Sequence, residues 1–151
     1  MKIRAAVKAD REAIWNIFHE IVAAGDTYAF DPNMSRAEAL AYWFRADTHT
    51  YVAEIHRQSV AEAVGFPGTA TPSPIVGTKD RVIAGTYILR PNQSGPGSHI
   101  ANAAFMVTAN AQGSGVGRAM AEHCLSEARR MGFRAMQFNF VVSTNASAVK
   151  L

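Results

Sequence analysis

The sequence predicts a single α+β domain that spans residues 1–151, on three observations. The chain is 48% hydrophobic and 18% charged, which is typical of one globular domain with its own core. Segments with strand periodicity and with helix periodicity follow one another in the order β-α-α-β-β-β-α-β-α. A glycine-rich turn joins the fourth predicted strand to the third predicted helix.

The first third of the chain predicts one strand and two helices. Residues 2–7 alternate apolar and polar side chains, as a half-buried strand does. Asp10 is placed to cap the next helix, whose apolar residues recur at helical spacing from Ile14 onward. Ser35 and Glu38 form a capping-box pattern that opens the second helix.

The middle of the chain predicts three strands and two connections. The strands are residues 51–55, 82–89 and 99–107, which are rich in β-branched, aromatic and other apolar residues. Residues 57–77 are rich in Pro, Gly, Ser and Thr, and they are long for a connection within one domain. We expect them to form a surface excursion, and residues 90–97 to form a second turn-rich loop.

The last third predicts a helix, a strand and the start of another helix. Residues 115–131 carry one apolar stripe, which includes Cys124, and Gly132 is placed to end this helix. Residues 133–142 predict a strongly apolar strand. Residues 145–151 predict a helix that has just begun.

Composition excludes several classes of function. The single cysteine cannot form an internal disulfide, which indicates a reducing compartment, and no apolar stretch approaches the about 18 residues of a membrane span. The net charge of +3 is dispersed, with no basic run, so we expect no nucleic-acid partner. The histidines lack metal-ligand spacing, so we expect no metal. We expect a cytoplasmic protein.

The segment from Gln112 to Arg118, QGSGVGR, is the most informative stretch. Glycines allow positive φ and close approach of the backbone to a ligand, and the first free amides of a helix attract anions. A strand-to-helix turn of this kind therefore predicts a phosphate or pyrophosphate site.

Two common phosphate-binding loops do not fit this segment. A Walker A loop needs Lys and then Ser or Thr after its last glycine, but Arg118 and Ala119 follow Gly117. A dinucleotide fingerprint that begins at Gly113 needs glycine at its sixth position, which is again Arg118. The pattern that remains is Gln or Arg, two residues, Gly, one residue, and Gly or Ala, which the segment matches in full.

This pattern resembles the acetyl-CoA loop of the GNAT N-acetyltransferase family. The predicted order of elements is also that of the GNAT acyl-CoA N-acyltransferase fold, a mixed central sheet flanked by helices. The segment from Asn145 to Leu151 is similar to the family's next motif, Asn-x-x-Ala-x-x-Leu. The resemblance therefore covers nearly the whole chain and implies a transferase that moves the acetyl group of acetyl-CoA to an amine.

The resemblance also implies binding residues for acetyl-CoA. The loop residues that would present amides to the pyrophosphate are Gln112, Gly113, Gly115, Gly117 and Arg118. The backbone of Phe105 and Val107 would hold the pantetheine arm, and Asn145 would help to hold the cofactor. The Val107 amide and Asn145 are the implied catalytic groups, the amide as an oxyanion donor.

The resemblance leaves the general base and the general acid open. The family's usual glutamate is missing from residues 101–107, which leaves His99, Glu54 or a water chain as candidates for the base. The family's usual tyrosine follows the last Leu of its motif, where this chain stops at Leu151. We therefore expect a truncated C-terminus without the last strands, and an uncovered apolar edge that a homodimer would cover.

Three asparagines in and after the last two predicted strands bear on the substrate. The spacing of Asn102, Asn139 and Asn145 is similar to that of the GNAT branch that acetylates proline-like cyclic imino acids such as azetidine-2-carboxylate. Asn102 and Asn139 are then candidate substrate ligands, or alternatively core amides that bond the backbone.

The loop between the first two helices supplies further substrate candidates, Thr27, Tyr28 and Phe30. Tyr28 and Phe30 are equally compatible with core packing. Amino-acid acetyltransferases of the phosphinothricin type share this loop and are the second substrate class. A non-catalytic module that binds acyl-CoA is the alternative function, because the sequence supplies no certain acid or base.

Overall fold

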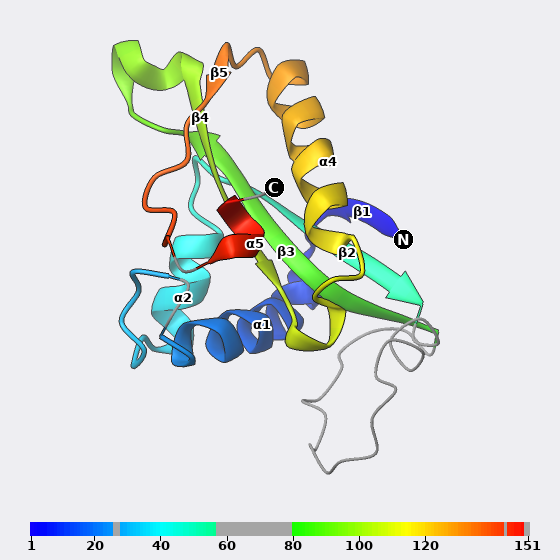
Figure 1. The fold of residues 1–151 in the computed structure, drawn as a ribbon. Helices are drawn as coiled ribbons and strands as arrows, with labels where there is room; N and C mark the ends of the chain where they lie inside the picture. The colour runs from blue at the N-terminus through cyan, green and yellow to red at the C-terminus, as the bar shows by residue number, and fades with distance from the viewer. Residues whose placement is uncertain (26–27, 57–79, 144, 150–151) are drawn as a thin grey trace.

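Five strands form one mixed sheet in the computed structural model, in the order β1-β2-β3-β4-β5 (Figure 1). The structure describes residues 1–25, 28–56, 80–143 and 145–149. The strands are β1 (Lys2–Ala5), β2 (His49–His56), β3 (Arg81–Pro91), β4 (Ile100–Val107) and β5 (Ala135–Met136). Neighbours from β1 to β4 pair antiparallel, whereas β5 pairs parallel to β4. The predicted α+β class and mixed sheet are confirmed.

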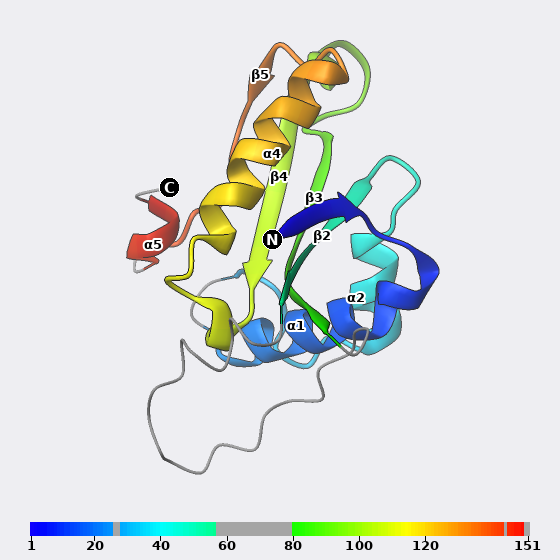
Figure 2. The same cartoon turned by 90° about the vertical axis from the view of Figure 1, so that its right-hand side faces the viewer.

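Helices cover both faces of this sheet (Figure 2). The α-helices are α1 (Arg11–Ala23), α2 (Arg36–Trp43), α4 (Val116–Arg130) and α5 (Ala146–Val149). Short 3-10 turns are η1 (Lys8–Asp10), η2 (Gly95–His99) and η3 (Ala109–Ala111). Helices α1 and α2 pack on one face and α4 packs on the other, so each face has its own apolar core.

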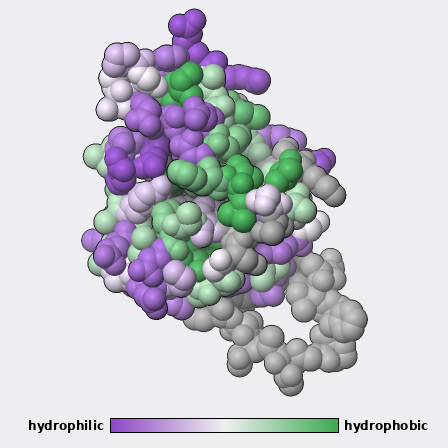
Figure 3. Space-filling model, turned by 60° about the vertical axis from the view of Figure 1, so that its left-hand side comes forward, coloured by the Kyte–Doolittle hydropathy of each residue, from purple (hydrophilic) through white to green (hydrophobic). Residues whose placement is uncertain are grey.

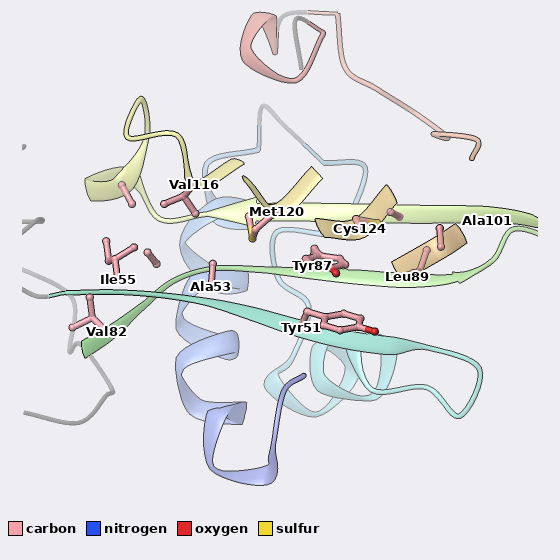
Figure 4. Close-up of a cluster of buried hydrophobic side chains, with 14 residues drawn as sticks. Tyr51, Ala53, Ile55, Val82, Tyr87, Leu89, Ala101, Val116, Met120 and Cys124 are labelled. Atoms are coloured by element: carbon pink, nitrogen blue, oxygen red, sulfur yellow. The ribbon is translucent and has the colours of Figure 1, made fainter. Parts of the chain in front are cut away.

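The core under α4 holds the stripe predicted for this helix (Figure 4). Val116, Met120 and Cys124 are buried against side chains of the central strands, among them Tyr87. Gly85 on β3 permits this close approach, because a Cβ at this position would lie 2.9 Å from the Met120 Cε atom and from the Met106 carbonyl oxygen.

The core under α1 and α2 contains a buried chain of hydrogen bonds. The Trp43 indole Nε1 donates to Thr86 Oγ1 at 3.0 Å, and Thr86 Oγ1 donates to the Tyr51 carbonyl at 2.8 Å. Trp43 and Thr86 are both fully buried. Because water does not reach these groups, the Thr86 hydroxyl satisfies an indole that would otherwise lose its partner.

Most predicted boundaries are confirmed to within a few residues, including the capping box of α2. Ser35 Oγ accepts from the Glu38 amide at 3.3 Å, and Glu38 Oε2 accepts from the Ser35 amide at 2.9 Å. Gly132 ends α4 with a φ of +84°. The excursion expected at residues 57–77 lies outside the described residues.

The long strand expected at residues 133–142 is wrong. Only Ala135 and Met136 pair with β4, and the chain then leaves the sheet. Phe138 is 50% exposed and Phe140 is 87% exposed, the latter with a φ of +57°. At the point where β4 would offer its next amide, the Gln137 carbonyl instead accepts from the Asn102 side chain at 2.9 Å.

The expected cap at Asp10 is also wrong. Its carboxylate makes no capping bond to α1 and instead accepts from the Arg4 guanidinium, at 2.6 and 2.9 Å, and from the Val7 amide at 2.7 Å. Arg4 also pairs with Glu54 on β2 at 2.6 Å. The Asp10 side chain therefore ties β1 to the turn that enters α1.

We expect Thr86→Val to lower the free energy of unfolding by about 1–3 kcal/mol, because the indole of Trp43 and the Tyr51 carbonyl lose a buried partner. Thr48→Val is the matched control, since the Thr48 hydroxyl contacts only the exposed Asp47 carboxylate, and it should change stability by less than about 0.5 kcal/mol. Urea denaturation measures both. Equal losses of unfolding free energy in the two variants would contradict a stabilising role for the buried hydrogen bonds of Thr86.

The stability of the chain should also depend on Asp10 at acidic pH. Burial favours the neutral acid, but hydrogen bonds from Arg4 and Val7 outweigh it and lower the pKa of Asp10. This contribution is present above the unfolded pKa of about 3.9 and is lost as the pH falls through the folded pKa.

Asp10→Asn should therefore destabilise the protein most at neutral pH and less as the pH approaches about 3. Urea unfolding at a series of pH values measures the difference. Asp47→Asn serves as the control, because its carboxylate pairs with Arg45 at the surface and is worth less than about 1 kcal/mol. A pH-independent effect of Asp10→Asn would exclude the ion pair as its cause.

Candidate functional site

The glycine loop, residues 109–118, turns from the end of β4 into α4. Gly113 has a φ of +76° and Gly115 a φ of +84°, in the left-handed region that glycine alone enters without strain. No described atom lies within 4 Å of a Cβ built at either residue, so this side of the loop is open. The loop is held on its inner side, where the Ser114 hydroxyl donates to the Ala111 carbonyl at 2.6 Å.

The start of α4 provides the anion-binding amides that the sequence predicts. Gly115 is the N-cap, and the first bond of the helix runs from the Ala119 amide to the Gly115 carbonyl at 3.0 Å. The amides of the first turn have no acceptor within the helix, and the helix dipole adds partial positive charge there. Arg118 lies exposed in the same turn. This end of α4 therefore suits a phosphate group.

The loop lies against the end of β4. A Cβ built at Gly117 would have the Val107 Cγ2 atom as its nearest neighbour, at 3.9 Å. The Ala109 amide donates to Glu20 Oε1 on α1 at 3.1 Å, which fixes the start of the loop. The predicted phosphate site and the predicted pantetheine strand are therefore adjacent.

The outer edge of β4 is open beyond its first two residues. The bond from the Thr108 amide to the Ala84 carbonyl, at 2.9 Å, sets the alternation along the strand, so even-numbered residues bond to β3. The amides and carbonyls of Ala103, Phe105 and Val107 then point away from β3. Because β5 pairs only as far as Ala101, these groups face a gap and not a neighbouring strand.

This gap contains a cavity of about 260 Å³. Its walls come from β4, from α4, from the segment that follows β5 and from the start of α5. Phe105, Tyr28, Asn139 and Asn145 all line it, so the structure brings together four residues that the sequence singles out. Figure 3 views the molecule from the side of the β5–α5 connection, where hydrophobic residues gather.

Tyr28 closes one wall of the cavity and bonds the open strand edge. Its hydroxyl donates to the Phe105 carbonyl at 2.5 Å, and burial raises the pKa of this hydroxyl. Phe30 stacks on Tyr28, with 5.5 Å between ring centroids, and also contacts Phe18 in the core. Tyr28 thus lines the cavity and also packs against the core, whereas Phe30 packs against Tyr28 and does not line the cavity. Thr27 lies outside the described residues.

The three asparagines have different positions. Asn145 Oδ1 accepts from the Ala148 amide at 3.1 Å and so caps α5. Asn102 lies outside the cavity wall and holds the Gln137 carbonyl at 2.9 Å. Asn139 lies in the wall and donates to Asn92 Oδ1 at 2.8 Å.

Asn139 belongs to a ring of three side-chain amides. Asn92 Nδ2 donates to Gln137 Oε1 at 3.3 Å, and Gln137 Nε2 donates to Asn139 Oδ1 at 3.2 Å, which closes the ring. Sequence reasoning missed the contributions of Asn92 and Gln137. The alternation of Gln137 with Asn139 was a signal for a shared face, but Asn92 is 45 residues from Gln137 and gave no local sign.

The cavity wall contains no carboxylate and no imidazole among its described residues. Glu54 is bound to Arg4, and His99 Nδ1 contacts the Pro96 carbonyl at 2.8 Å, so both sequence candidates for the base are engaged elsewhere. Cys124 lines the cavity, but burial first and Glu127 second raise the pKa of its thiol to about 12. A neutral buried thiol is a packing residue and a poor nucleophile.

The described parts of the chain contain no group of three or more His, Cys, Asp or Glu side chains arranged to hold a metal ion. Nor do they contain a helix with the length and apolar character that crossing a membrane requires.

Comparisons with known proteins agree with this geometry. The acetyltransferase (GNAT) family pattern matches residues 15–151. The N-acetyltransferase aca1 of Schizosaccharomyces pombe is 33% identical over 130 residues, which are 86% of this chain and 58% of that relative. The chain thus spans less than two thirds of the length of that protein.

Solved structures give the same result. A GCN5-related N-acetyltransferase from Kribbella flavida has a TM-score of 0.78 at 39% identity, over 99% of this chain and 77% of that one. A phosphinothricin acetyltransferase from Sinorhizobium meliloti, solved with acetyl-CoA, has a TM-score of 0.72 at 17% identity, over 99% and 70% of the two chains, and shows a shared fold. The chain therefore belongs to the GNAT acetyltransferase family.

Proposed function

We propose that this chain binds acetyl-CoA and transfers its acetyl group to the amine of a small molecule. The observation that carries the proposal is the line that runs from the glycine loop, along the open edge of β4, to the cavity. The loop offers free amides, the strand edge offers alternating amides and carbonyls, and the cavity offers an apolar end. These three parts match a pyrophosphate, an amide-bearing pantetheine arm and an acetyl thioester, in that order.

Acetyl-CoA is a thioester that an amine can attack directly: the C–N bond forms, the C–S bond breaks, and CoA leaves as a thiolate that is protonated to the free thiol while the nitrogen loses a proton. The backbone of Phe105 and Val107 points away from β3, and we assign the Val107 amide as the donor to the acetyl carbonyl oxygen as it gains negative charge; such a donor is worth about 100–1000-fold in rate. Tyr28 holds the Phe105 carbonyl, so this stretch of the strand keeps its orientation. Cys124 is fully buried, and burial raises the pKa of its thiol, so we assign it a packing role and propose direct transfer without an acetyl-cysteine intermediate.

The acceptor that we favour is an amino acid or a cyclic imino acid such as azetidine-2-carboxylate. Asn139 in the cavity wall, with Asn102 beyond it, supplies neutral amide groups that suit a small polar molecule. The spacing of the asparagines supports the imino acid. The fold shared with phosphinothricin acetyltransferases makes other amino acids the next class to test.

The glycine loop can be tested with two matched glycine-to-alanine variants. Gly115→Ala should weaken acetyl-CoA binding by about tenfold or more, because alanine at φ +84° costs about 1–2 kcal/mol and the loop must rearrange. Gly117→Ala has ordinary φ and free space, so it should bind within about twofold of the original chain. Isothermal titration calorimetry with acetyl-CoA measures both. Equal affinities in the two variants would remove the loop from the binding site.

The acceptor can be tested by release of free CoA thiol with azetidine-2-carboxylate as the amine. Asn139→Ala should raise KM for the acceptor by about tenfold while the affinity for acetyl-CoA is kept, because the cavity loses a polar contact. Asn33→Ala, an exposed side chain that does not line the cavity, is the control. Tight binding of acetyl-CoA without turnover on any amine would favour a non-catalytic acyl-CoA-binding module.

A further inference from the structure

Arg90, at the end of β3, is a half-buried cation with no carboxylate partner among the described residues. Its guanidinium lies 5.0 Å from the centroid of the Tyr42 ring and donates to the Tyr42 hydroxyl at 2.9 Å. These contacts stabilise its position, but neither neutralises its charge. A partly desolvated charge without an opposite charge is costly, so its retention calls for a physical reason.

The other arginines in the described part of the chain differ from Arg90. Arg4, Arg36, Arg45, Arg81 and Arg130 each lie within 4.0 Å of a carboxylate oxygen. Those without such a partner in the described residues are Arg11, Arg118, Arg129 and Arg134, and all four are exposed to solvent. Arg90 alone in this set combines partial burial with the lack of a carboxylate.

The position of Arg90 connects it to the candidate site. Ala104, which lines the cavity, pairs with Ile88 across the sheet, and the next pair on the same face is Asn102 with Arg90. This pair lies about 7 Å along the strands from the first. Side chains opposite each other on one face are neighbours, so the base of the Arg90 side chain lies beside Asn102.

The surroundings of Arg90 are rich in neutral hydrogen-bonding groups. Asn92 follows two residues after Arg90 and joins the amide ring with Gln137 and Asn139, which reaches the cavity wall. On the other side, Tyr42 contacts Phe30 at 5.0 Å between centroids, and Phe30 stacks on the cavity residue Tyr28. Arg90 and Tyr42 do not line the cavity themselves, but Phe30 links Tyr42 to the cavity residue Tyr28, and Arg90 lies in the next residue pair on the same face beyond the cavity residue Ala104.

We propose that Arg90 binds the carboxylate of the acceptor and so makes the enzyme specific for acceptors with a free acid group next to the amine. This inference rests on the proposed acetyl transfer and specifies the chemistry of its acceptor. Guanidinium presents five N–H donors in a planar fork that matches a carboxylate, and the bond to Tyr42 occupies only one of its nitrogens. Asn102 and Asn139 then supply neutral donors beside the charged pair.

The test compares two acceptors of similar size, one with a negatively charged group beside the amine and one with a neutral group: azetidine-2-carboxylate and azetidine-2-carboxamide. For each, kcat/KM is measured in the original chain and in Arg90→Gln, and the variant is compared with the original on the same acceptor. This ratio cancels the difference between the two amines in their own reactivity. Arg129→Gln, which removes an exposed arginine at the far end of α4, is the control.

We expect Arg90→Gln to lower kcat/KM about tenfold or more for the acid and less than about twofold for the carboxamide, with acetyl-CoA affinity unchanged. Arg90→Lys keeps the positive charge but loses the planar pair of donors, so its kcat/KM for the acid should lie between those of the original chain and Arg90→Gln. If Arg90→Gln does not fold, Arg90→Met keeps the apolar stem over Tyr42 and takes its place in the same comparison.

Two results would overturn the inference while leaving acetyl transfer intact. One is an equal loss on both acceptors, which assigns Arg90 a structural role, and the other is a greater loss on the carboxamide than on the acid. If the original chain acetylates no amine although it binds acetyl-CoA, the proposed function itself is wrong, and the role of Arg90 falls with it.

Discussion

The early end of the pairing between β4 and β5 is the constraint on which the rest of the site depends. Two residue pairs join these strands, and the Gln137 carbonyl then turns to the Asn102 side chain. If the ladder continued, the amides of Ala103, Phe105 and Val107 would be bonded to a strand, and the segment after Met136 would fill the space of the cavity. A side-chain amide thus takes the carbonyl that the next backbone amide of β4 would otherwise reach, at the place where the sheet opens.

The open edge has an energetic consequence. Backbone groups in an apolar gap are costly unless they find a partner, and here only the Phe105 carbonyl has one, from Tyr28, among the three outward-facing residues considered. A ligand with alternating amides and carbonyls satisfies these groups in the way a strand would. The same residues then serve folding and binding, because the cost of leaving β4 unpaired is offset when the ligand binds.

Features that depend on adjacent residues could be predicted from the sequence. Contacts between residues that are distant in the sequence could not. The capping box at Ser35, the end of α4 at Gly132 and the turn around Gly115 depend on a few adjacent residues, and all were predictable. Residues 133–142 were predicted to be a strand because most of them are apolar, but Phe138, Phe140, Val141 and Val142 line a cavity. The Asp10 carboxylate likewise pairs with Arg4 and does not cap α1, because the fold places the Arg4 guanidinium next to it. Two other contacts depend on the register between strands, which local periodicity does not predict. They are the hydrogen bond between Asn92 and Gln137 and the pairing of Arg90 with Asn102.

The charge distribution of the site bears on how the acceptor amine loses its proton. The cavity wall has no acid or base among its described residues, so in the proposed transfer none of these residues takes the proton of the attacking amine. The proposed contact between Arg90 and the acceptor would act on this step. Near a bound carboxylate the Arg90 cation cancels a negative charge that would otherwise stabilise the ammonium form of the acceptor, and so it favours the neutral amine that can attack. Binding and activation of the acceptor are then two effects of one charged group, held in place by an aromatic ring that carries no charge itself.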